Sequence, residues 1–129
     1  MNAPGLSAYT QTNIESIVHE ATPHKLIDML FKGAKDALAQ AIGAIERNDF
    51  EAKSKKISKA DEIILNLQTY LDKDKGGEVA DNLNELYTYM ATTLIDANRL
   101  NDASKVREVA GLLETVSDGW RSMSDEYKK

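Results

Sequence analysis

The sequence predicts an all-α protein, an antiparallel four-helix bundle with a short N-terminal helical or extended segment. Apolar residues recur at alternating steps of three and four along four long stretches, which is the spacing of helices that bury one face. Short polar segments separate these stretches, and short connections make neighbouring helices run antiparallel. The 129 residues, 1–129, are enough for one domain and too few for a second.

Residues 1–20 are expected to be a mobile N-terminal segment, with the bundle at 22–128. Ile14 and Val18 follow Tyr9 at a spacing that suits a short amphipathic helix. A proline, a glycine and several polar residues precede that stretch, and chain ends of this kind are often poorly ordered. The segment is therefore predicted to be either a short helix or extended chain.

The first long helix is predicted over residues 23–46. Thr22 is a favoured N-cap residue type, and Pro23 suits the first helical position because an N–H there has no intrahelical acceptor. The apolar arc of this helix is wider than one seam needs, so Met29 and Phe31 fit the core and a partner groove equally well. The predicted inner stripe contains Ile27, Leu30, Ala34, Ala37, Ala41 and Ile45.

The second helix is predicted over residues 50–71, after a turn at Arg47-Asn48-Asp49. Gly76-Gly77 then ends the helical pattern, and a glycine pair outside any phosphate-binding motif is best explained as a chain reversal. The seam of this second helix contains Ile57, Ala60, Ile64, Leu67 and Leu71.

The third helix is predicted to run from about Ala80 to the cap at Asn101-Asp102, and the fourth to follow Asp102. Trp120 falls on the seam of the fourth helix and is expected in the core, whereas Tyr89 lies off its seam, as a lone surface tyrosine or part of a docking surface. The third seam contains Ala80, Leu83, Tyr87, Met90, Leu94 and Ala97; the fourth contains Val106, Val109, Leu113, Val116, Trp120, Met123 and Tyr127.

No residue pattern in the chain indicates catalysis or metal binding. The chain has no cysteine, so thiolate metal sites and disulfides are excluded. His19 and His24 are five residues apart across a proline and cannot share one helical face, which leaves two partly exposed histidines near a helix start. We interpret the chain as a non-enzyme that uses no cofactor and no metal.

Charge and hydropathy exclude two further classes of partner. The formal net charge is −5, with both signs mixed along the chain, so nucleic acid is not an expected partner. No apolar run approaches the ~20 residues of a membrane span, and the first residues lack the pattern of a signal peptide. The expected location is the cytoplasm, with no membrane partner.

The surplus of apolar residues suggests grooves for another chain rather than for a small molecule. An amphipathic segment of a partner would bury its own apolar face there. The candidate groove-lining or groove-supporting residues are Leu30, Ile63, Leu67, Leu71, Tyr87 and Leu94.

Three stretches form a more specific pattern: TPHKLIDMLFKGA at 22–34, LDKDKGGEVADNLNELYTYM at 71–90 and DANRLND at 96–102. With Tyr9 upstream and Trp120 downstream, they resemble the flagellin-specific export chaperones of the FliS type. The similarity covers nearly the whole chain, with the same order and spacing of turns.

The resemblance implies a small cytosolic helical bundle that binds the C-terminal segment of newly made flagellin. Such a chaperone prevents premature polymerisation and delivers flagellin to the flagellar type III export apparatus, and a co-chaperone or regulator is a further expected partner. The resemblance also implies that the segment around Tyr9 and Ile14 docks loosely near the flagellin groove. Both residues join the candidate partner-binding set.

Two positions depart from the family pattern. Lys32 stands where an acidic residue is usual, and Thr92-Thr93 replace a basic pair that many members carry. Two alternative functions remain: a helical adaptor for another amphipathic segment, and a histidine phosphotransfer domain. The phosphotransfer domain needs an exposed histidine in mid-helix, which neither histidine provides.

Overall fold

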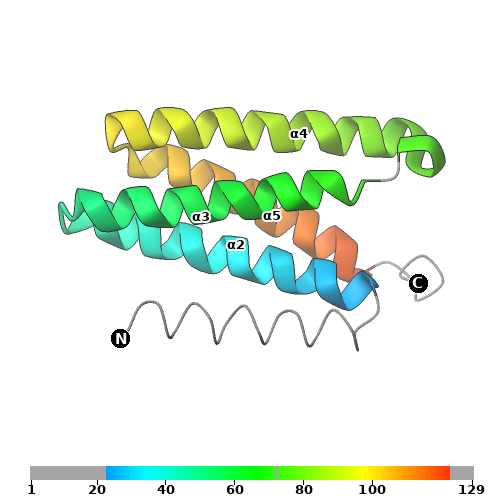
Figure 1. Cartoon of the computed structure of the whole chain (residues 1–129), viewed down its shortest axis with the longest axis horizontal. Helices are drawn as coiled ribbons and strands as arrows, with labels where there is room; N and C mark the ends of the chain where they lie inside the picture. The colour runs from blue at the N-terminus through cyan, green and yellow to red at the C-terminus, as the bar shows by residue number, and fades with distance from the viewer. Residues whose placement is uncertain (1–22, 72, 123–129) are drawn as a thin grey trace.

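The computed structural model describes residues 23–71 and 73–122, and every regular element in these ranges is a helix. Helix α2 spans Pro23–Glu46, α3 Phe50–Thr69, α4 Lys73–Leu100 and α5 Ala103–Ser122. Both α2 and α4 pack against α3 and α5, so the helices form an antiparallel four-helix bundle (Figure 1). The predicted fold class is confirmed.

The predicted boundaries agree closely with the structure, with two corrections. Helix α3 ends at Thr69 and does not continue to Leu71 as predicted. The backbone N–H of Tyr70 caps the helix by donating to the Leu67 and Gln68 carbonyls. Helix α4 begins at Lys73, so the predicted break falls inside it: Gly77 has φ 54° and ψ −128° and kinks the helix. A positive φ is sterically easy for glycine, which explains why the kink falls there.

Two turns close one end of the bundle, which we call the closed end. In the α2–α3 turn Asn48 has φ 60°, and in the α4–α5 turn Asn101 has φ 53°. Asparagine tolerates this left-handed conformation better than most residues. Asp49 then caps α3 by accepting from Ala52 N–H at 3.2 Å, and Asp102 caps α5 by accepting from Ser104 N–H at 2.9 Å.

The other end of the bundle, which we call the open end, holds the start of α2, the end of α3, the start of α4 and the end of α5 (Figure 1). The residues at which the described chain stops, 23, 71, 73 and 122, all lie there. The predicted N-terminal segment, with Tyr9 and Ile14, and the fourth-helix residues Met123 and Tyr127 lie outside the described residues.

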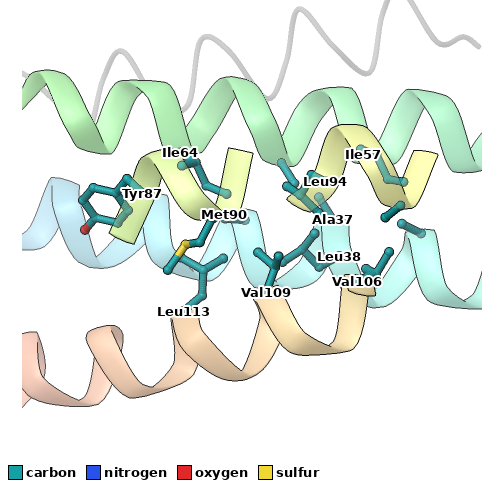
Figure 2. Close-up of a cluster of buried hydrophobic side chains, with 14 of the residues drawn as sticks. Ala37, Leu38, Ile57, Ile64, Tyr87, Met90, Leu94, Val106, Val109 and Leu113 are labelled. Carbon is teal, nitrogen blue, oxygen red and sulfur yellow. The ribbon is translucent and has the colours of Figure 1, made fainter. Parts of the chain in front are cut away.

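One hydrophobic core runs through the four helices (Figure 2). Phe31 is 2% exposed, which assigns it to the core rather than to a groove, while Met29 is partly buried. In the predicted stripe of α2, Ile27, Leu30 and Ile45 are only partly buried, because the helix packs between two neighbours and its buried face is centred elsewhere. That face contains Phe31, Ala34, Ala37, Leu38, Ala41 and Ala44.

Lys53 is the one charged residue that the described core encloses, at 5% exposure. Its Nζ donates to the Asn98 carbonyl at 2.8 Å and to Asn101 Oδ1 at 2.6 Å, and lies 5.5 Å from the centre of the Phe50 ring. The C-terminal carbonyls of a helix favour a cation. Lys53 therefore joins the start of α3 to the end of α4 and holds the two turns together.

We predict that Lys53→Met lowers the free energy of unfolding by roughly 1–3 kcal/mol, because two partly buried acceptors, the Asn98 carbonyl and Asn101 Oδ1, lose their donor. Urea denaturation of both proteins measures this difference. Lys55→Met is the matched control, since its side chain is 74% exposed and its ion pair with Glu51, at 3.5 Å, lies on the surface. Equal stability of the two variants would contradict the assigned role of Lys53.

We predict that Tyr87 makes the bundle unstable in alkali. Burial raises the pKa of its phenol from 10.0 to about 12. Below pH 10 the phenol is neutral in both states; above it the unfolded chain ionises first, so stability falls as pH rises from 10 to about 12. Over that range the loss is roughly 2–3 kcal/mol. Denaturation at several pH values should show that the free energy of unfolding falls less steeply with pH in Tyr87→Phe than in wild type. In Tyr70→Phe, which changes a half-exposed side chain, it should fall as steeply as in wild type.

Candidate partner-binding surface

The bundle consists of two helical hairpins, α2–α3 and α4–α5, and polar contacts join one hairpin to the other. Between α2 and α5, Lys35 pairs with Glu114 at 2.8 Å, Arg107 with Glu46 at 2.8 Å and Arg121 with Asp28 at 3.2 Å. The Lys35 ammonium lowers the pKa of Glu114 by donating a hydrogen bond to its carboxylate and by charge attraction. These pairs follow the whole length of the α2–α5 seam.

An aromatic contact completes the α2–α5 seam at the open end. Trp120 Nε1 donates to the His24 carbonyl at 3.2 Å, and the two rings stack with centroids 4.8 Å apart. Trp120 packs against the core from its edge, and His24 is partly buried. Trp120 thus packs on the core, but it is partly buried and lies at the edge of the core rather than inside it, where its seam position had placed it.

Amides and hydroxyls join α3 to α4. Gln68 Nε2 donates to Asn84 Oδ1 and to Thr88 Oγ1, both at 3.0 Å, and Ser54 Oγ donates to Asn98 Oδ1 at 3.1 Å. Together with the α2–α5 ion pairs, these bonds fix the register between hairpins. Neither of these two seams presents a continuous apolar surface.

The outer edge of the α2–α3 hairpin is apolar at the open end. A Cβ at Gly33 would lie 3.4 Å from Cδ1 of Ile63, so the two helices are in close contact there. Leu26, Met29 and Leu30 precede Gly33 by one or two helical turns and share its side of α2. We call this edge the α2–α3 edge; its apolar residues are Leu26, Met29, Leu30, Ile63, Tyr70 and Leu71, all partly or half exposed.

The α4–α5 hairpin has a similar edge on the opposite face of the bundle. The Tyr89 hydroxyl donates to Glu108, a bond that raises the pKa of Tyr89 and marks where the helices face each other. From there α5 runs away from α4 towards the start of α2 (Figure 1). We call this the α4–α5 edge; its apolar residues are Val79, Leu83, Leu86, Leu112 and Val116, none of them fully buried.

The structure divides the predicted partner-binding residues into two groups. Leu30, Ile63 and Leu71 are partly buried and lie on the α2–α3 edge. Leu67, Tyr87 and Leu94 are 3%, 3% and 0% exposed and belong to the core beneath, where they can support a groove but not line it. Tyr9 and Ile14 lie outside the described residues.

No residue of the α4–α5 edge was among the candidate partner-binding residues predicted from the sequence. The sequence does carry a signal, because Leu86 and Leu112 are apolar and stand directly before a seam residue, Tyr87 and Leu113. Apolar residues beside a seam widen the apolar arc of a helix beyond what its own core absorbs. Of the departures from the family pattern, Lys32 and Thr92 are exposed, whereas Thr93 is buried.

Within residues 23–71 and 73–122, no group of three or more His, Asp or Glu side chains is placed to hold a metal ion. None of the helices α2 to α5 is both long enough and apolar enough to cross a membrane.

Comparison with known proteins gives one consistent family. The family model described as Flagellar protein FliS matches residues 5–127. The Flagellar secretion chaperone FliS of Salmonella typhimurium is 48% identical over 123 residues, covering 95% of this chain and 91% of that protein. FliSB of Pseudomonas aeruginosa is 44% identical, covering 92% and 94%, and FliS of Escherichia coli K12 is 39% identical, covering 92% and 88%.

Proposed function

Since the chain belongs to the FliS family of flagellar proteins, we propose that it is a cytoplasmic secretion chaperone for flagellin. It binds the C-terminal segment of newly made flagellin, prevents premature polymerisation and delivers it to the flagellar export apparatus. This is a binding function with no catalytic step. Export-apparatus components and a co-chaperone or regulator are further partners in the proposal.

The observation that carries this proposal is the pair of apolar edges at the open end. Large aliphatic side chains there pack against the core yet keep part of their surface exposed. A partner helix that inserts its apolar residues between them removes that surface from water, at about 25 cal/mol per Å² of apolar area. A segment that is disordered when free can follow both edges around the bundle as it folds.

Within this proposal the residues have different tasks. Leu30, Ile63 and Leu71 contact the client directly, and the residues of the α4–α5 edge do the same on the opposite face. Leu67, Tyr87 and Leu94 hold the edges in place from the core. Tyr9 and Ile14 bring the N-terminal segment close to the client.

We predict that Ile63→Glu and Leu86→Glu each weaken binding of a C-terminal flagellin peptide by about tenfold or more, because a carboxylate replaces an apolar contact. Isothermal titration calorimetry measures the dissociation constants. Ala39→Glu is the matched control, since it adds the same charge at an exposed position of α2 away from both edges. Binding by wild type should also persist as salt rises to about 0.5 M, where surface charges are largely screened.

Two results would count against the proposal. One is failure of the wild-type protein to bind the flagellin peptide. The other is binding that Ile63→Glu and Leu86→Glu leave unchanged, which would place the client elsewhere.

A further inference from the structure

The α3–α4 seam contains three polar residues of α3 spaced by seven: Ser54, Asp61 and Gln68. A spacing of seven keeps side chains on one face of a helix. Ser54 bonds across to Asn98, and Gln68 bonds across to Asn84 and Thr88. Since α3 and α4 are antiparallel, the middle residue, Asp61, lies opposite α4 residues 91–95.

Asp61 differs from the other two because its carboxylate is not satisfied. Its Oδ1 is fully enclosed and has no hydrogen-bond partner among the described residues. Burial alone raises the pKa of this carboxyl, with no neighbouring cation acting against it. An enclosed acceptor without a donor is uncommon in folded proteins and costs about 1–3 kcal/mol.

The adjacent part of α4 does not supply the donor. The hydroxyls of Thr88 and Thr92 donate to main-chain carbonyls of their own helix, at 3.0 Å each. Ala91 and Ile95 carry no polar side-chain group. On α3, Lys59 and Glu62 are exposed and lie away from the seam by helical position.

Two exposed aliphatic side chains flank Asp61. Leu65, one turn after Asp61 on α3, is 51% exposed, and Ile95 on α4 is 61% exposed. We call Asp61, Leu65 and Ile95 the Asp61 surface. It combines one carboxylate with two apolar contacts, and it lies between the hairpins, apart from the two hairpin edges.

We propose that the Asp61 surface binds a basic side chain, arginine or lysine, of the client segment, with apolar residues of the same segment packing on Leu65 and Ile95. This inference rests on the proposed chaperone function. Asp61 as a residue is only partly buried, so its outer oxygen is within reach of a partner. A guanidinium or ammonium bound there neutralises the charge that burial disfavours.

The charge of the site selects this occupant over a purely apolar one. A neutral apolar helix laid on Leu65 and Ile95 would remove the remaining water from the Asp61 carboxylate without pairing it, which is unfavourable. A basic residue turns the same position into a paired contact. The Asp61 surface would thereby fix the register in which an otherwise apolar client segment binds.

A double-mutant cycle tests this inference. The C-terminal peptide of the host's flagellin is prepared as wild type and with each Arg or Lys replaced singly by Gln, and each peptide is titrated against wild type, Asp61→Asn and Glu62→Gln. We expect that loss of one particular basic residue weakens peptide binding to wild type and to Glu62→Gln about tenfold, relative to the unmodified peptide. The same substituted peptide should bind Asp61→Asn as tightly as the unmodified peptide binds Asp61→Asn. Glu62→Gln is the matched control because it removes one exposed carboxylate next to Asp61.

A second variant protects the test against a folding effect of Asp61→Asn. Leu65→Lys places a cation one helical turn from Asp61 at an exposed position, where it competes for the carboxylate. It should weaken binding of the unmodified peptide and abolish its dependence on the same basic residue, whereas Leu65→Gln should keep that dependence.

Each outcome has a distinct meaning. If each Arg→Gln or Lys→Gln substitution in the peptide lowers the affinity for wild type and for Asp61→Asn by the same factor, the Asp61 inference is overturned and the chaperone proposal stays intact. Absence of any binding to wild type would overturn both.

Discussion

The alanine-rich packing of α2 against its neighbours is the constraint on which the rest of the structure depends. Ala34, Ala37, Ala41 and Ala44 are all at most 2% exposed, and Ala60 of α3 is fully buried. Small side chains let helix axes approach closely, so this part of the bundle closes with little space to fill. Larger core residues such as Phe31, Ile64 and Leu67 stand nearer the open end, where they leave aliphatic neighbours only partly covered.

Much of the fold could be predicted because local signals and core packing agree. Pro23 and the turn after Glu46 predicted both ends of α2 correctly, and Asp102 correctly marked the start of α5. The third and fourth seams identified buried residues such as Met90, Leu94 and Val109. Such agreement between capping, turn chemistry and periodicity is typical of sequences that specify one fold.

The errors arise where the outcome depends on a neighbouring helix. Periodicity finds the apolar side of α2 but not the direction from which its two neighbours approach, so Phe31 could not be placed in the core. The same limit applies to the candidate surface, since Leu67 and Leu94 are apolar and correctly spaced yet fully covered. Lys53 carries no sequence signal, because an enclosed charge is defined by the residues packed around it. Asp61 shares a spacing of seven with Ser54 and Gln68, but the enclosed, unpartnered Oδ1 is seen only once α4 lies beside α3.

The polar contacts of the α2–α5 and α3–α4 seams explain how the two apolar edges stay exposed instead of packing on each other. Surface ion pairs such as Arg107–Glu46 contribute only about 0–1 kcal/mol each, so their main effect is not stability. These ion pairs and the side-chain hydrogen bonds of Gln68 and Asn98 instead depend strictly on geometry. They therefore hold the two hairpins in one register. The core supplies the free energy of folding, and the polar seams decide which apolar side chains remain outside it. A chaperone surface needs both properties, because edges free to pack on each other would hide the apolar area that the client must cover.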